Sequence, residues 1–155
     1  MKDKLLYTTK ELFDSYLRGK YYTIPEYQRG YKWETKDIDC LLKDINNFSK
    51  NDDLDLFYCL QNITLVENKD SFNVVDGQQR LTTLAIILSY LGEYSLINEK
   101  IQYNIRKETE EFLKEYIYKS SNIKTIENWE QLLSISSLEN KDYDYQDVYY
   151  LFNAY

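Results

Sequence analysis

The sequence contains no histidine among its 155 residues, and this absence removes several classes of enzyme. A Ser-His-Asp triad, a Cys-His dyad, a His-ligated zinc and a His-metal nuclease centre all require an imidazole within the chain. Any chemistry must therefore come from carboxylates, amides, arginines, lysines, hydroxyls or a borrowed metal ion. The two cysteines, Cys40 and Cys59, lack the spacing of a disulfide framework or a metal site, which predicts a reducing, cytoplasmic environment.

Long hydrophobic runs and basic clusters are also missing. No run of about 18 apolar residues is present, so the sequence predicts no membrane span. The first sixteen residues lack the apolar core of a signal peptide. The formal net charge is −7, without a basic tail. Because nonspecific DNA binding needs several lysines or arginines facing phosphates, we expect this chain to bind duplex DNA only weakly.

The hydrophobic pattern predicts an α+β domain in which helices pack on a small mixed sheet. Two short strands, at 62–66 and 72–75, flank the turn residues "ENKD" and are typical of a β-hairpin. The helix that follows, from Asp76 to about Gly92, is apolar on nearly all sides, which predicts a central, buried position. The other predicted elements are a helix from a Thr8-x-x-Glu11 capping box to about Leu17, a strand at 21–24, a helix that Thr35 caps and that runs to Phe48, a strand at 101–105, and helices at 108–120, near 129–133 and from Asp144 onward.

The order of these elements divides the chain into two parts. We expect a core at 1–95, which holds the predicted hairpin and the buried helix, and a helical extension at 96–155. The apolar stripe of the last helix continues to Tyr155. This pattern predicts that the chain is part of a longer protein.

The stretch "FNVVDGQQRLTTLAIIL" at 72–88 places amides and an arginine at the front of the buried helix. One interpretation is local: Asp76 caps the helix, Gln79 completes a capping box, Gly77 permits a tight entry, and Arg80 pairs with a surface acid. The other is functional, because a helix N-terminus presents free N–H groups and a partial positive charge to an anion. Gln78 and Gln79 would add neutral hydrogen-bond donors. Arg80 would add a guanidinium group, whose paired N–H donors match the geometry of a phosphate. The residue types and their spacing, taken alone, favour the local interpretation.

A second Gln-Arg pair, Gln28 and Arg29, lies in "IPEYQRGYKW" at 24–33. Two such pairs that converge on one cleft would suit a polyphosphate. The chain has no Gly-x-x-x-x-Gly-Lys-Ser/Thr motif, so a P-loop is not expected.

The two motifs "IPEYQRGYKW" and "VVDGQQRLTTL", about fifty residues apart, resemble the paired signature of the GmrSD-type restriction enzyme N-terminal domain family. The stretch "YCLQNITLV" at 58–66 resembles the family's middle strand, and "NIRKETEEFL" at 104–113 its downstream arginine-containing helix. The resemblance covers nearly the whole chain and implies a ParB/sulfiredoxin-like fold. Gln61 departs from the pattern, because a glycine is usual there.

The resemblance implies a nucleotide-binding and NTP-hydrolysing regulatory module of a bacterial modification-dependent restriction or phage-defence system. It implies a nucleoside triphosphate with Mg²⁺ as ligand, and as partner a His-Asn-His-type nuclease domain or subunit, which is missing from this histidine-free chain. The site residues that it implies are Gln28, Arg29, Gly77, Gln78, Gln79 and Arg80 for the nucleotide, with Asp76 and Arg80 as catalytic candidates and Asp76 as candidate metal ligand.

Three functions stay open at this point. The first is hydrolysis of a nucleoside triphosphate. The second is a module that senses nucleotide or modified DNA without hydrolysis, and the third is a ParB-like nuclease that acts by itself. Phosphate release and plasmid nicking by the purified chain distinguish them.

Overall fold

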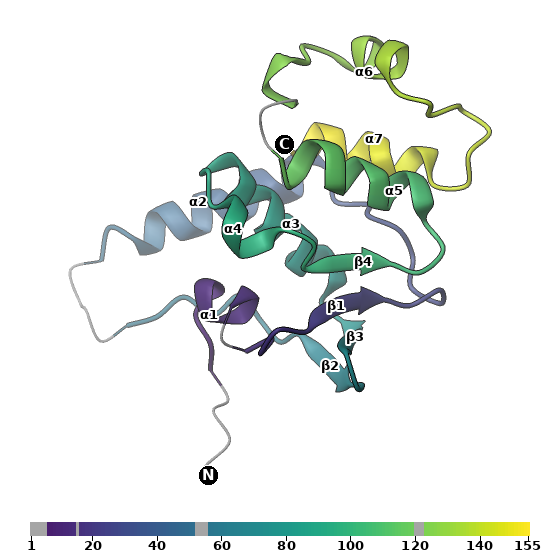
Figure 1. Ribbon diagram of the computed structural model, residues 1–155. Helices are drawn as coiled ribbons and strands as arrows, with labels where there is room; N and C mark the ends of the chain where they lie inside the picture. The colour runs from purple at the N-terminus through teal and green to yellow at the C-terminus, as the bar shows by residue number, and fades with distance from the viewer. Residues whose placement is uncertain (1–5, 15, 52–55, 120–122) are drawn as a thin grey trace.

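The computed structural model describes residues 6–14, 16–51, 56–119 and 123–155 (Figure 1). Its centre is a four-stranded mixed sheet in the order β2-β3-β1-β4. The strands are β1 (Tyr21–Ile24), β2 (Thr64–Glu67), β3 (Ser71–Asp76) and β4 (Ile101–Tyr103). Strand β1 runs parallel to both β3 and β4, whereas β2 and β3 form the predicted antiparallel hairpin. The predicted α+β class is thus confirmed.

Helices pack on this sheet, and the hairpin strand β2 lies away from most of them (Figure 1). They are α1 (Thr9–Phe13), α2 (Thr35–Phe48), α3 (Gln78–Tyr90), α4 (Tyr94–Ile97), α5 (Lys107–Phe112), α6 (Trp129–Ile135) and α7 (Tyr145–Ala154). Helix α5 continues into a π-helical turn at Leu113–Ile117, and a short 3₁₀ turn follows at Ile123–Thr125. In Figure 1, α5 and α7 lie side by side on the β4 side of the molecule, and the two helices are in contact.

Helix α3 is the central, buried helix that its composition predicted. Leu81 and Ala85 are completely buried, and so are the hydroxyl residues Thr82 and Thr83. Buried hydroxyls need partners, and Thr82 shares a hydrogen bond of 3.1 Å with the hydroxyl of Tyr103 on β4. The front of α3 is therefore fixed relative to the sheet.

The first two predicted helices each have a boundary that was wrong. The Thr8–Glu11 capping box is present, but α1 ends at Phe13 instead of Leu17, because the backbone at Asp14 leaves the helical region (φ −114°, ψ −86°). The N-cap of α2 is Glu34 and not Thr35. Glu34 has extended backbone angles, and its N–H donates to Oδ2 of Asp37 at 2.9 Å.

Strand β4 lies beyond residue 95, yet it pairs with β1 and completes the sheet. The predicted core and extension therefore share one sheet, and their division into separate parts stays a prediction. No helix in the described ranges is long and apolar enough to cross a bilayer.

Candidate functional site

Four separate segments of the chain meet at one edge of the sheet. Because β1, β3 and β4 are parallel, their carboxyl ends lie at the same edge, and the segments 25–32, 76–80 and 104–106 begin there. Strand β2 is antiparallel to β3, with Thr64 opposite Asp76, so the residues before β2, 61–63, reach the same edge. In Figure 1 the arrows of β1 and β4 both point toward this edge. We call these four segments the strand-end site; ligands of open α/β sheets bind at such an edge.

The amide of Gln79 binds the backbone of the 25–32 segment. Its Nε2 donates to the carbonyl oxygen of Gly30 at 2.9 Å, and its Oε1 accepts the N–H of Lys32 at 2.8 Å. A side-chain amide has both a donor and an acceptor, so one glutamine satisfies two backbone groups of a loop that has no strand partner there.

Gln78 and Gln28 make the same kind of contact. Nε2 of Gln78 donates to the carbonyl oxygen of Arg29 at 2.7 Å, and Nε2 of Gln28 donates to that of Val75 at 2.7 Å. The two motifs thus hold each other across about fifty residues of sequence. Whether these three amides also contact a nucleotide stays a prediction.

The predicted capping role of Asp76 was wrong, because the N-cap of α3 is Gly77. Gly77 has left-handed backbone angles (φ 89°, ψ 9°), and its carbonyl oxygen accepts the N–H of Leu81 at 2.9 Å. Asp76 instead ends β3, and its side chain is 71% exposed, with Oδ2 3.7 Å from Nη2 of Arg80. The capping box fails as well, because Gln79 turns toward the 25–32 loop.

The backbone before β2 packs directly against Gly77. A Cβ atom at this position would lie 2.9 Å from Cγ1 of Ile63 and 3.2 Å from the carbonyl oxygen of Asn62. Gln61 has φ 69°. This is the left-handed region, which glycine adopts without strain, so a glycine would fit at this position.

The guanidinium group of Arg80 also contacts the segment before β2. Nη1 donates to Oε1 of Gln61 at 3.0 Å, and Nη2 donates to the carbonyl oxygen of Asn62 at 2.7 Å. The Nε atom of Arg80 is buried, and no acceptor lies within reach among the described residues. Arg29 is exposed, and its guanidinium makes no hydrogen bond or ion pair within the described part of the chain. The common cleft predicted for these two guanidinium groups stays a prediction.

A buried ion-pair network lies behind the 25–32 loop. Nη1 of Arg106 is 2.5 Å from Oδ2 of Asp147 on α7, and Nη2 of Arg106 donates to the carbonyl oxygen of Gln28 at 3.3 Å. The other oxygen of Asp147 is 3.1 Å from Nζ of Lys32. Sequence reasoning missed the network: Arg106 appeared only inside the family resemblance, and nothing in the sequence marked Asp147.

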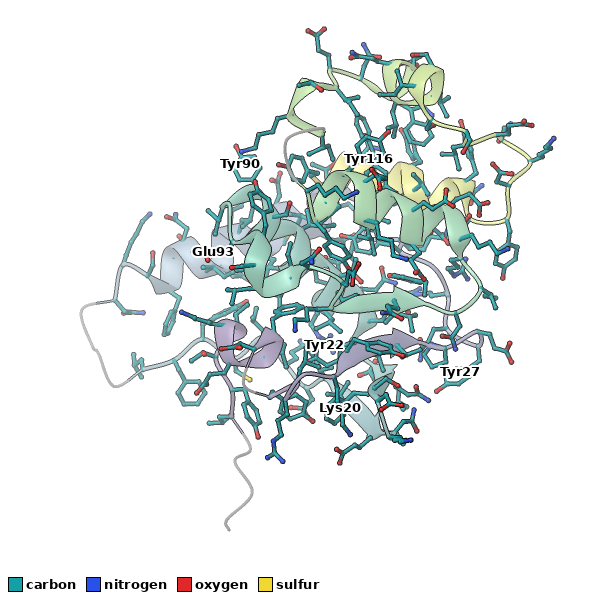
Figure 2. The ribbon with its side chains drawn as sticks, in the orientation of Figure 1. Lys20, Tyr22, Tyr27, Tyr90, Glu93 and Tyr116 are labelled. Carbon is teal, nitrogen blue, oxygen red and sulfur yellow. The ribbon has the colours of Figure 1, made fainter. Side chains whose placement is uncertain are left out.

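The hydroxyl groups behind the site are neutral donors and acceptors. Tyr31 is completely buried and shares a hydrogen bond of 2.8 Å with Oγ1 of Thr83. Burial raises the pKa of Tyr31, and it also raises the pKa of Tyr103. Both phenols therefore stay protonated at neutral pH and serve as fixed hydrogen-bond partners. Tyr27, in contrast, is exposed beyond the end of β1 (Figure 2).

A hollow of about 720 Å³ adjoins the strand-end site at residues 61–63. Its far side is formed by the start of α1, and aromatic rings of Tyr7, Tyr16 and Tyr58 contribute to its walls. This volume lies within the range of small-molecule sites. No group of three or more acidic, cysteine or histidine side chains that could hold a metal ion occurs within the described ranges.

Comparison with known proteins identifies a matching family. The sequence model of the family described as "GmrSD restriction endonuclease, N-terminal domain" matches residues 9–155. Neither a curated protein nor a solved structure matches the chain.

Proposed function

Because the chain belongs to the family of GmrSD restriction endonuclease N-terminal domains, and is thus a component of a restriction or phage-defence system, we propose that it binds and hydrolyses a nucleoside triphosphate at the strand-end site. The family comprises the N-terminal domain of the enzyme, so the nuclease is a separate part of such a protein. Hydrolysis here would regulate that part.

The observation that carries this proposal is a set of unsatisfied donors at one edge of the sheet. The guanidinium of Arg29 is exposed and has no partner within the described chain, and Nε of Arg80 is buried without an acceptor. No side chain caps the first turn of α3 in the described structure, so its N–H groups are also available. Positive charge and free N–H groups together favour a phosphate ligand.

The exposed carboxylate of Asp76 fits Mg²⁺ that arrives with the nucleotide. Mg²⁺ keeps several waters and commonly binds one or two carboxylates together with phosphate oxygens, so one aspartate is a sufficient protein ligand. The ion pair of Asp76 with Arg80 is long, at 3.7 Å, and leaves the carboxylate accessible. When bound, the ion would neutralise phosphate charge.

The residues of the chain would then stabilise the phosphoryl group and keep the site in shape. Arg29 and Arg80 would stabilise the negative charge on the transferring phosphoryl group. Gln28, Gln78 and Gln79 hold the loop that carries Arg29 against the end of β3 and the start of α3, where Arg80 lies, through the backbone contacts described above. Gly77 brings the N–H groups of α3 to the same edge.

The experiment is titration calorimetry of the purified chain with each of the four common ribonucleoside triphosphates and Mg²⁺, followed by an assay of phosphate release. We expect binding and release in the wild type, and loss of both in Arg29→Gln and Arg80→Gln. Arg18→Gln is the matched control, because Arg18 is an exposed arginine that precedes β1, at the opposite end of that strand.

Three other results would contradict the proposal. Binding without phosphate release would favour the sensing module. Nicking of a plasmid by the chain alone would favour the ParB-like nuclease. If Arg18→Gln weakens binding as much as Arg29→Gln does, general charge and not the strand-end site attracts the nucleotide.

A further inference from the structure

Gly30 occupies a position where no side chain fits. Three of the four glycines, Gly19, Gly77 and Gly92, have left-handed backbone angles, but Gly30 does not. A Cβ atom on Gly30 would overlap the carboxylate group of Asp147. The glycine in "YQRGYKW" is therefore required by its neighbour on α7 and not by its own backbone conformation.

The carboxylate that excludes this Cβ atom is itself held firmly. Asp147 is 2% exposed and Arg106 is 8% exposed, and their ion pair measures 2.5 Å. Buried charges are costly unless they are paired and hydrogen-bonded, so this network tolerates little displacement. Arg106 also donates to the carbonyl oxygen of Gln28, and Lys32 pairs with the second oxygen of Asp147. One end of the 28–32 segment is thus bound by Arg106 and the other end by Asp147, the ion-pair partner of Arg106.

The same segment is bound on its other side by α3. Gln79 contacts Gly30 and Lys32, and Gln78 contacts the carbonyl oxygen of Arg29. Helix α3 holds the segment by neutral hydrogen bonds, whereas α7 holds it by charge and by close packing on Gly30.

From this double attachment we propose that Asp147 is a positioning residue of the strand-end site, which holds the 28–32 segment, and with it Arg29, in the geometry that binds phosphate. The inference rests on the proposed function and extends it to α7. Asp147 contacts no nucleotide; it acts through Arg106, Lys32 and the fit on Gly30.

The first test compares two buried aspartates of the same helix end. Asp147→Asn removes the charge with little change of shape, and we expect nucleotide affinity and phosphate release to fall about 10- to 100-fold, as when a residue that orients a binding group is lost. Asp144→Asn is the matched control. Asp144 is also buried, but its carboxylate accepts the N–H of Thr109 on α5 and not a group of the 28–32 segment. Equal losses per folded molecule in both variants would overturn the proposal.

A double-mutant cycle gives a second test. General destabilisation would not produce the result that we expect from it. Gly30→Ala alone should weaken nucleotide binding, because its methyl group displaces the carboxylate. In an Asp147→Gly background the carboxylate is absent, so Gly30→Ala should add little further loss. If the two losses simply add, the fit between the two residues does not determine the geometry of the site.

A third measurement does not depend on nucleotide. The N–H of Lys32 donates to Oε1 of Gln79 at 2.8 Å, and its hydrogen exchange reports whether the segment is held in place. We expect faster exchange in Asp147→Asn than in wild type and Asp144→Asn. Unchanged exchange at Lys32 would overturn the positioning role, even if wild type binds nucleotide. Faster exchange in Asp147→Asn, together with a wild type that binds no nucleotide, would overturn the proposed function alone.

Discussion

Replacing Gln79 tests directly whether the signature glutamines hold the 25–32 loop. Gln79 makes two hydrogen bonds with that loop, to the carbonyl oxygen of Gly30 and from the N–H of Lys32. Each such bond contributes about 0.5–1.5 kcal/mol net, and a buried group that is left without a partner costs about 1–3 kcal/mol. Gly30 is buried and Lys32 is half-buried. We therefore expect Gln79→Met, which keeps the length of the side chain, to lower the free energy of unfolding by about 2–4 kcal/mol.

Gln79→Glu tests separately whether the donor of the Gln79 amide is needed. A glutamate can still accept the N–H of Lys32, but it presents a second oxygen to the carbonyl oxygen of Gly30, where the amide donates. We expect this variant to be destabilised by a similar amount although it differs from wild type by one group. Both variants keep the aliphatic stem, so lost packing does not explain the change.

The assay is urea unfolding followed by circular dichroism, with linear extrapolation to water. Gln102→Met on β4 is the control, because Gln102 is also half-buried and its amide makes no hydrogen bond within the described part of the chain. Stability of Gln79→Met within about 0.5 kcal/mol of wild type, the usual range for surface changes, would refute the claim that this amide holds the loop.

Three further predictions concern the front of α3 and the start of α5. Asp76→Ala and Asp76→Asn should unfold within about 1 kcal/mol of wild type, since they remove only an exposed ion pair, but lose phosphate release; full hydrolysis in Asp76→Asn would show that the carboxylate has no catalytic role. Gly77→Ala should cost about 1–2 kcal/mol for its left-handed backbone, and more for the contact at 2.9 Å; wild-type stability in urea would contradict that conformation. A hydrogen bond with Asp144, followed by burial, raises the pKa of Glu108 from 4.5 to about 7. The folded state therefore binds the extra proton between these values, so Glu108 should stabilise the fold at low pH and lose this effect as pH rises from about 4.5 to 7. Thermal melts should show a flatter pH dependence in Glu108→Gln, and an unchanged one would contradict the prediction.

The local pattern of the chain was sufficient to predict most elements. The hairpin, the buried helix α3 and the strands β1 and β4 follow from alternation, helical spacing and turn residues, which act within a few residues of sequence. Asp76 and Gly77 show where this reasoning ends. Both residue types occur at N-caps, and only the continuation of β3 through Asp76 decides between them.

Long-range contacts were beyond the reach of local patterns. Gln79 completes a capping motif with Asp76 in the sequence, yet its amide, like that of Gln78, binds a residue nearly fifty positions away. The role of Asp147 was also not predictable, because an acid in the first turn of a helix is normally explained by the helix dipole alone. The contact between Asp147 and Gly30 depends on how α7 packs on the 28–32 segment, which the local sequence does not indicate.

The Asp-Gly-Gln-Gln-Arg motif separates into two sets of residues by what its side chains contact. Gly77 fixes the turn from β3 into α3, and Gln78 and Gln79 bind backbone of the other motif, so these three build the edge of the sheet. Asp76 ends β3 and Arg80 lies in the first turn of α3, and they keep an exposed carboxylate and an unsatisfied guanidinium nitrogen at that edge. A group that is already satisfied by the protein gains little from a ligand, whereas an unsatisfied charged group gains much. The first and last residues of the motif are therefore the ones that we expect to contact the nucleotide, and the three between them determine where those two residues lie.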